Sequence, residues 1–271
     1  MKLVVAGSDR VDAGKTTFAV GLLEHAEAGV AKPRAGNDYW FDHDDYLAAA
    51  GEGRLYGKDA RRLAAAGATG ARPEALNPIH RLWTPAPGSG TGVLGRRDRA
   101  FLVDRVTVGG DERYVVNGRR ELPRPVEAAL PLSDATVVES LPEFNDVMGR
   151  LHRRALDEAA DRIGALDRAV VESYADIARP IAGFEPDGVA VVEPGRARLY
   201  DGERYANACS VASGSAREGR LEERVEAVLE LVEPRARVSL PPLAGERRGD
   251  PAAVADAYEP AYEALIATAL E

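Results

Sequence analysis

Residues 2–18 read KLVVAGSDRVDAGKTTF, and this stretch decides how the rest of the chain is interpreted. Residues 2–7 contain a short apolar run, which is typical of a buried strand in a parallel sheet. Apolar residues from 15 to about 28 are spaced as in a helix. A strand, a Gly-Lys-Thr loop and a helix in this order surround phosphate oxygens with backbone N–H groups and a helix N-terminus.

The loop does not have the standard Walker A length. The pattern G-x-x-x-x-G-K-[ST] requires a glycine where this chain has Asp9, and the nearest glycine is Gly7. The order of the elements still predicts nucleotide binding, with Lys15 neutralising phosphate charge and the Thr16 hydroxyl binding Mg²⁺. We expect the nucleotide to contact the loop and the first helical turn, namely Ser8, Asp9, Arg10, Asp12, Ala13, Gly14, Lys15, Thr16 and Thr17.

Composition excludes several classes of protein. The chain has 271 residues and a formal net charge of −9, which argues against nucleic-acid binding because that requires a basic surface. No apolar run approaches the roughly 20 residues that span a bilayer, and no signal-peptide pattern is present. The single cysteine, Cys209, fits a reducing compartment and is expected to be buried rather than catalytic. We expect a cytoplasmic protein without nucleic-acid or membrane partners.

The pattern along the chain predicts one α/β domain over residues 1–271, with a mainly parallel sheet and helices on both faces. Residues 37–47 are polar and aromatic, and an alanine-rich helix is expected from there to about residue 66. An insertion is expected at about 84–122, with a flexible loop and a β-hairpin at 101–118. The remaining expected strands are 30–33, 168–172, 188–194 and 238–240, and the remaining helices are 142–164, 216–232 and 251–269. Residues 198–205 are expected to form a small turn or hairpin.

Lysine usage singles out a second cation. Only four of the 35 basic residues are lysines, so a lysine is more informative here than an arginine. Lys32 ends the second expected strand, opposite the phosphate loop. We interpret it as binding a substrate carboxylate or a phosphate, and the alternative is a surface charge.

Several segments resemble one branch of the P-loop NTPases. Residues 7–16 resemble the G-T-D-T-x-x-G-K-T loop of dethiobiotin synthetase with one extra residue, and also the glycine-serine loop of cobyrinic acid a,c-diamide synthases. KPRAG (32–36) resembles K-P-V-x-x-G of the former, and KPRAGNDYWFD (32–42) resembles K-x-G-P-D-Y-I-D of the latter. VESYADIARP (171–180) stands where dethiobiotin synthetase has V-E-G-A-G-G-x-x-x-P, and LPPL (240–243) resembles its proline segment beside the adenine.

The resemblance implies a P-loop NTPase fold, the superfamily that also holds the ParA/MinD-type ATPases, with ATP and Mg²⁺ as cofactors. It implies catalytic roles for Lys15, Lys32 and Glu172, and places Pro241 next to the adenine. The metal ligands it implies are Thr16, Asp45 and Glu172. Asp42 and Asp44 are alternatives to Asp45 as the metal aspartate. In the cobyrinate pattern, Asp38 and Asp42 fit better. Glu139 is an alternative to Glu172, because each follows a Val-Val pair.

The implied activity is that of an ATP-dependent, ligase-like enzyme, which activates a carboxylate or carbamate of a small molecule by phosphoryl transfer. The substrate, a carboxylate or an amine, is not identified by the sequence. A homodimer is expected from the resemblance alone. There are two alternatives. One is a nucleotide switch, which would be an ATPase or GTPase that acts on a protein partner, and the other is a small-molecule kinase. No Asn-Lys-x-Asp guanine motif occurs, which favours ATP over GTP.

Overall fold

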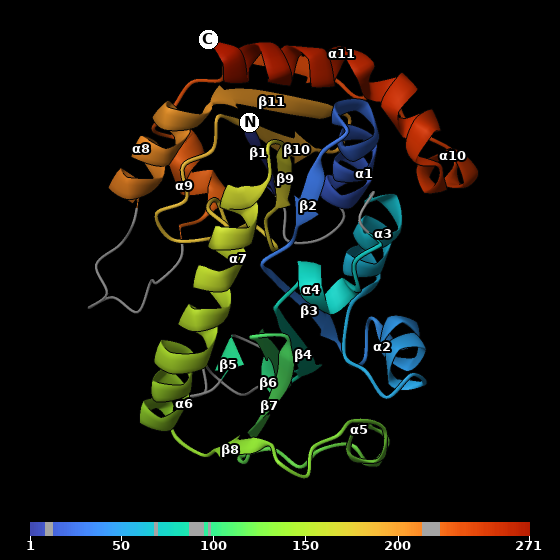
Figure 1. The fold of residues 1–271 in the computed structure, drawn as a ribbon, viewed down its shortest axis with the longest axis vertical. Coiled ribbons are helices and arrows are strands. Elements are labelled where there is room, and N and C mark those ends of the chain that lie inside the picture. Colours follow the sequence, from blue (N-terminus) through green and yellow to red (C-terminus); the bar gives the residue numbers. More distant parts are fainter. Residues whose placement is uncertain (9–12, 68–69, 87–94, 97–98, 213–222) are drawn as a thin grey trace. The chain divides into compact units, whose positions relative to one another are not determined.

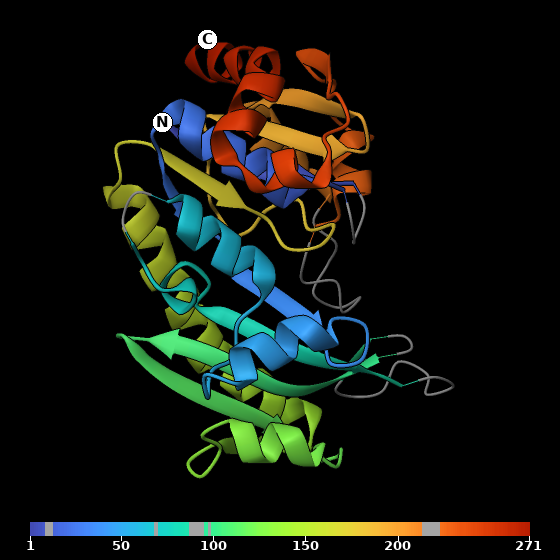
Figure 2. The same ribbon diagram turned by 90° about the vertical axis from the view of Figure 1, so that its right-hand side faces the viewer.

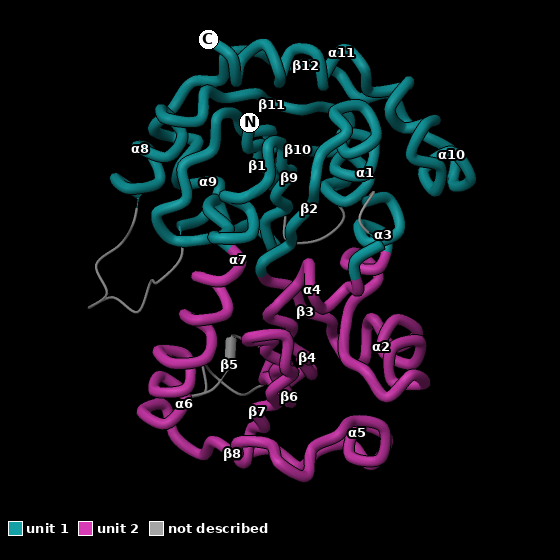
Figure 3. Tube along the Cα trace, viewed as in Figure 1, with its two compact units in different colours: residues 1–33, 62–71, 160–271 teal, residues 34–61, 72–159 magenta. Residues whose placement is uncertain are grey.

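The computed structural model describes residues 1–8, 13–67, 70–86, 95–96, 99–212 and 223–271. The chain divides into two compact units (Figure 3). Unit 1 comprises residues 1–33, 62–71 and 160–271, and unit 2 comprises residues 34–61 and 72–159. Each unit has a β-sheet of its own.

Unit 1 is built on a six-stranded sheet of order β12-β11-β10-β1-β9-β2 (Figures 1 and 2). Its strands are β1 (Lys2–Gly7), β2 (Gly29–Ala31), β9 (Ala169–Glu172), β10 (Gly188–Glu193), β11 (Arg196–Asp201) and β12 (Ala236–Ser239). β2, β9, β1 and β10 are parallel neighbours, whereas β11 and β12 extend one edge in antiparallel fashion. The parallel strands are apolar and buried along most of their length, as both faces of this sheet are covered.

The helices of unit 1 lie on both faces of its sheet, as predicted. They are α1 (Lys15–Ala26), α8 (Gly202–Ala212), α9 (Val225–Leu229), α10 (Gly245–Gly249) and α11 (Pro251–Leu270). On one face, Leu3 of β1 and Leu265 of α11 both approach Gly188 of β10. On the other face, Val4 lines a pocket together with Tyr205 of α8. Successive residues of β1 therefore point to opposite helical layers.

A close helix contact holds α1 in place. A Cβ at Gly21 would lie 2.5 Å from the Tyr262 hydroxyl and 2.6 Å from a methyl of Val254, so only glycine permits this approach of α11. The Tyr262 hydroxyl donates a 3.0 Å hydrogen bond to the carbonyl of Phe18, and the two rings meet edge to face. This contact anchors the helix that begins at the Gly-Lys-Thr segment.

Unit 2 contains a second mixed sheet, of order β3-β4-β6-β7-β8 with β5 paired to β6. Its strands are β3 (Arg34–Asp38), β4 (Ile79–Pro85), β5 (Gly95–Arg96), β6 (Arg99–Val108), β7 (Asp111–Asn117) and β8 (Thr136–Val138). β6 and β7 are antiparallel around Gly109 and Gly110, which both have positive φ, and this confirms the predicted hairpin. Its helices are α2 (His43–Ala50), α4 (Pro73–Leu76), α5 (Arg124–Ala129) and α6 (Leu141–Val147), with a π-helical turn Met148–His152.

Two further helices, α3 (Lys58–Ala66) and α7 (Arg153–Ala165), carry the chain from unit 2 into unit 1. The predicted α/β class is confirmed, but the expected single, mainly parallel sheet is replaced by two mixed sheets. The segment expected as an insertion at 84–122 pairs with β4 and is only one part of unit 2, which comprises residues 34–61 and 72–159. The single-domain assignment itself stays a prediction.

Two local predictions were also wrong. The alanine-rich helix to residue 66 is interrupted after α2, where Gly53 adopts a φ of 69° that ends helical geometry. Residues 198–205, expected as a turn or hairpin, instead finish β11 and begin α8. Of the helix predicted at 216–232, α9 is present, and residues 216–222 lie outside the described part.

A buried charge cluster ties the π-helical turn of unit 2 to its sheet. Asp104 of β6 is fully buried and accepts two hydrogen bonds from the Arg81 guanidinium, at 2.6 and 2.5 Å. The Nε2 atom of His152 lies 3.3 Å from the same carboxylate. Burial by itself raises the pKa of Asp104, but the Arg81 guanidinium and His152 outweigh it and hold this pKa well below its usual range.

We predict that Asp104→Asn lowers the free energy of unfolding by about 3 kcal/mol at neutral pH, because it leaves Arg81 without its buried counter-charge. A carboxyl with a depressed pKa stabilises the fold above its unfolded-state pKa of about 3.9 and loses this effect as the pH falls below it. The difference between the wild type and the variant should therefore shrink in acid. Urea unfolding at several pH values measures it.

Asp111→Asn is the matched control, because Asp111 lies on the hairpin turn with its side chain 75% exposed. It should change the unfolding free energy by less than about 0.5 kcal/mol. Equal effects of the two substitutions would contradict the role given to the cluster.

Candidate functional site

The first turn of α1 has the geometry of an anion site. Gly14 precedes the helix with a φ of 87°, a left-handed conformation that glycine adopts without strain. It has no side chain to cap the helix, so the positive end of the helix dipole is presented to whatever lies before it. α1 is 12 residues long, and its first residues are Lys15, Thr16 and Thr17. A helix start of this kind favours a negatively charged ligand.

The side chain of Lys15 lies across Gly7, the last residue of β1. A Cβ at Gly7 would stand 2.9–3.0 Å from the Cδ, Cγ and Nζ atoms of Lys15. The Lys15 ammonium donates a 2.9 Å hydrogen bond to the carbonyl of Ala175. Gly7 is therefore a glycine because the lysine occupies the space of a side chain, a role that its position in the loop pattern did not indicate.

Glu172 is the second component of the site. It ends β9, which is a direct parallel neighbour of β1, so Glu172 and Gly7 are at the same edge of the sheet. Glu172 is fully buried, and its Oε1 atom accepts a 3.0 Å hydrogen bond from the Thr16 hydroxyl. The same oxygen accepts from the ammonium of Lys32. Its Oε2 atom has no hydrogen-bond partner among the described residues.

Lys32 follows β2 and is buried, with only 3% of its surface exposed. The surface-charge interpretation of Lys32 was therefore wrong. Its ammonium forms an ion pair with Glu172, which compensates a carboxylate that would be costly to bury alone. The predicted contact of Lys32 with a substrate or phosphate stays a prediction.

The loop after Glu172 is held in a strained conformation. Ala175 has a φ of 51°, which costs a residue other than glycine about 1–2 kcal/mol. The Ser173 hydroxyl donates a 2.7 Å hydrogen bond to Ile177, and Asp176 forms an ion pair with Arg224. These contacts fix the loop so that the Ala175 carbonyl meets Lys15, which could not be inferred from the residue types at 173–176.

Thus Lys15, Thr16, Lys32 and Glu172 come together in unit 1. Ser8 is half-buried directly after β1, Ala13 is buried, and the Thr17 hydroxyl accepts a 3.4 Å hydrogen bond from Arg62. Pro241 is exposed after β12. The predicted contacts of Asp9, Arg10 and Asp12 lie outside the described residues.

The predicted metal aspartate, Asp45, belongs to unit 2 and pairs with the ammonium of Lys58 at 3.3 Å. Partial burial raises the pKa of Asp45, although Lys58 acts in the opposite direction. Its competitors Asp38 and Asp42 form hydrogen bonds within the turn before α2, and Asp44 is exposed.

Glu139 is also in unit 2 and is exposed, whereas Glu172 is the glutamate that contacts Thr16. No group of three or more His, Cys, Asp or Glu residues is placed to hold a metal within the described ranges.

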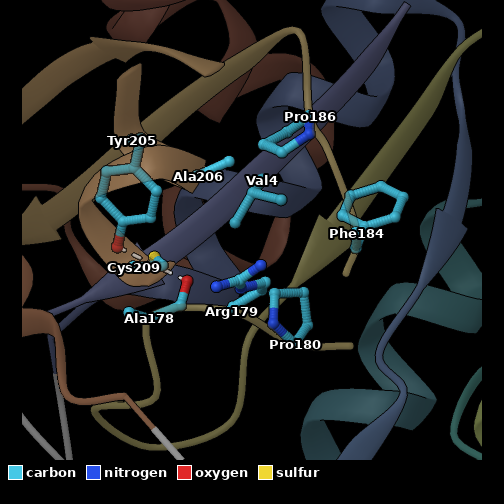
Figure 4. A pocket seen from close by; sticks show the side chains of 9 residues that line it. All are labelled: Val4, Ala178, Arg179, Pro180, Phe184, Pro186, Tyr205, Ala206 and Cys209. Carbon is cyan, nitrogen blue, oxygen red and sulfur yellow. Dashed lines mark hydrogen bonds between the residues drawn. The ribbon is translucent and has the colours of Figure 1, made fainter. Parts of the chain in front are cut away.

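A small pocket lies on the α8 side of β1 and is separate from this constellation of side chains (Figure 4). Its cavity volume is about 10 Å³, and it is lined by Val4, Ala178, Arg179, Pro180, Phe184, Pro186, Tyr205, Ala206 and Cys209. Its lining is mainly apolar. The guanidinium of Arg179 already donates to Ser210 and Glu223, at 3.2 and 3.4 Å.

Cys209 is buried, as predicted, and burial raises the pKa of its thiol to about 12. We therefore predict that the native protein reacts with a disulfide reagent far more slowly than the urea-unfolded chain near pH 8, because the thiolate is the reactive form. Raising the pH through about 8.5 should accelerate only the unfolded chain. The absorbance of the thiolate that the disulfide reagent releases measures the reaction. Because the chain has one cysteine, this absorbance reports Cys209 alone. Rapid stoichiometric labelling of the native protein would contradict the prediction.

Comparisons of the chain with models of protein families, with curated proteins and with solved structures found no match. In the part of the chain that the structure describes, no helix has both the length and the apolar character needed to cross a membrane.

Proposed function

We propose that this chain is an ATP- and Mg²⁺-dependent P-loop enzyme that transfers a phosphoryl group from ATP to a carboxylate or carbamate of a small molecule. The observation that carries the proposal is the buried Glu172, which contacts Thr16 in the first turn of α1 and keeps one carboxylate oxygen without a hydrogen bond among the described residues. The choice of acceptor group comes from the sequence resemblance to dethiobiotin synthetase and the cobyrinate synthases.

The residues present suit Mg²⁺ bound together with a polyphosphate. Mg²⁺ is a hard cation that takes oxygen ligands, usually one or two from the protein with the remainder from phosphates and water. The Thr16 hydroxyl and the Glu172 carboxylate are two such oxygens, 3.0 Å apart in the present hydrogen bond. The bound metal would neutralise the charge of the phosphates. A role for Asp45 as a third ligand stays a prediction.

Lys15 and the start of α1 would hold the phosphates. The Lys15 ammonium lies beside Gly7 and in front of the α1 N-terminus, where a phosphate oxygen would replace the Ala175 carbonyl as its acceptor. Catalysis of phosphoryl transfer consists mostly of positioning and charge stabilisation, which these groups supply. Lys32 balances the charge of Glu172 and thereby keeps the carboxylate in place.

The first test is calorimetric titration of the protein with ATP, with and without Mg²⁺. We predict that Lys15→Ala weakens ATP binding by about tenfold or more, since it removes a charge-assisted phosphate contact. Thr16→Ala should make the ATP affinity insensitive to Mg²⁺. Arg237→Ala, which changes an exposed cation in the same unit, is the control and should bind as the wild type does. Failure of the wild-type protein to bind ATP would overturn the proposal.

A second prediction concerns Gly7. We expect Gly7→Ala to displace the Lys15 side chain and to weaken ATP binding by several-fold, while thermal stability changes little because the displaced atoms end a flexible side chain. Gly164→Ala in α7 is the matched control, because a Cβ there meets no neighbouring atom within 4 Å. Equal ATP affinity of the two variants would show that Lys15 does not need the space at Gly7.

The second candidate is a nucleotide switch that acts on a protein partner. The observation in its favour is the hydrogen bond from Lys15 to Ala175, because a phosphate that takes over Lys15 changes a contact of the strained 173–178 loop. Turnover distinguishes the two. Hydrolysis that stays negligible until a carboxylate or amine is added supports the ligase-like enzyme, and slow hydrolysis stimulated by a protein supports the switch.

The location and assembly of the protein are also part of the proposal. A cytoplasmic homodimer remains the expectation, on the resemblance and on the presence of a single cysteine. Sedimentation at several protein concentrations measures the oligomeric state directly.

A further inference from the structure

The turn between β3 and α2 presents two aromatic rings to solvent. Trp40 is 69% exposed and Phe41 is 74% exposed. The rings touch edge to face, with their centroids 4.9 Å apart. Aromatic side chains of this size bury about 150–250 Å² each when they are covered, so an exposed pair is a large apolar surface to leave in water. We call these two residues the Trp40–Phe41 platform.

The turn that carries the platform is tightly hydrogen-bonded. The Asp38 carboxylate accepts from the backbone N–H groups of Trp40 and Phe41, at 2.9 and 3.2 Å. The Asp42 carboxylate in turn accepts from the N–H of Asp38 at 2.8 Å. These hydrogen bonds fix the backbone that carries the two rings, which reduces the entropy lost when a partner binds.

The core of unit 2 does not require these rings. The aromatic residues that this part of the core uses are Tyr46, which is buried, and Tyr39. The Tyr39 ring packs against the Tyr46 ring, with their centroids 5.1 Å apart. The His43 ring meets the Tyr39 ring edge to face. Its Nδ1 atom lies 2.9 Å from the backbone carbonyl oxygen of Tyr39. The core therefore gives the platform no inward-facing role, and the two rings remain available for an external contact.

The segment that carries the platform is acidic, and the cation that pairs with it is Lys58, which binds Asp45. Residues 37–47 (NDYWFDHDDYL) contain four aspartates and no lysine or arginine. Asp45 is paired with Lys58, but Asp44 is exposed and Asp42 is half-buried in the turn. The negative charge opposes contact with nucleic acid or with an anionic membrane and favours a cationic group.

We propose that the Trp40–Phe41 platform is a docking surface for an arginine-bearing, basic segment of a protein partner. A guanidinium can stack on the face of an aromatic ring while it donates hydrogen bonds to a neighbouring carboxylate. The platform supplies the ring through Trp40 and the carboxylates through Asp42 and Asp44. This surface lies within unit 2 and does not depend on the proposed nucleotide function.

The test is fluorescence anisotropy of a labelled hexa-arginine peptide titrated with the full chain at low ionic strength. We expect saturable binding that the double variant Trp40→Ala/Phe41→Ala weakens by about tenfold. Asp44→Asn should weaken it by about two- to fivefold and flatten its dependence on salt. A hexa-lysine peptide should bind more weakly than hexa-arginine, because an ammonium cannot stack on a ring and fork to a carboxylate at once.

Two matched controls separate this site from general attraction to an acidic protein. Val211→Ala removes an apolar side chain that is 73% exposed in unit 1, and Asp111→Asn removes an exposed charge on the hairpin turn of unit 2. Both should bind hexa-arginine like the wild type. All exchanged side chains are exposed, and circular dichroism confirms that the variants are folded.

Three results would overturn the proposal. The first is an absence of saturable binding of hexa-arginine to the wild type. The second is equal affinity of the wild type and the double variant, which would leave only non-specific electrostatic attraction. The third is self-association in sedimentation that the double variant abolishes, since a second copy of the chain would then be the occupant of the platform.

Discussion

A fully buried carboxylate, Glu172, is the constraint around which unit 1 is organised. An ionised group in the interior is tolerated only where an opposite charge and hydrogen bonds compensate for the water it has lost. Lys32 supplies the charge and Thr16 supplies a hydroxyl. These three residues come from the ends of β9 and β2 and from the start of α1, so they meet only if β9 lies beside both β1 and β2. The strand order and the ion pair therefore depend on each other.

The same arrangement explains why the glycines of the loop stand where they do. Gly7 leaves room for the Lys15 side chain, and Gly14 turns the backbone through a left-handed conformation into α1. With both glycines in place, the ammonium and the helix start face the edge of the sheet at which Glu172 lies.

Much of unit 1 could be predicted because its signals are local. Buried parallel strands appear as short apolar runs, and β1, β9 and β10 were recognised in this way. The scarcity of lysine drew attention to Lys32, which is buried in the structure. Its actual partner could not be foreseen, because an ion pair between Lys32 and Glu172 joins residues far apart in the chain.

Unit 2 was less predictable for the same physical reason. Its sheet depends on the pairing of β3 with β4 and of β4 with β6. The sequence of a strand of mixed composition does not indicate which other strand it pairs with. Arg105 is an example, since a charged residue in β6 reads as a surface position. It is fully buried and donates to the carbonyls of Leu55 and Asn77. Such a residue is recognised only when the acceptors that surround it are known.

The division of the chain into units also has a consequence for the order of events during synthesis. β1 is synthesised well before its neighbours β9 and β10, which end only at residues 172 and 193. Unit 2 is complete once residue 159 has left the ribosome, so it can fold while β1 still waits for its partners. The apolar strand β1 therefore stays on the nascent chain without its sheet neighbours until more than 160 further residues have been synthesised, as its strand bounds and those of β9 require.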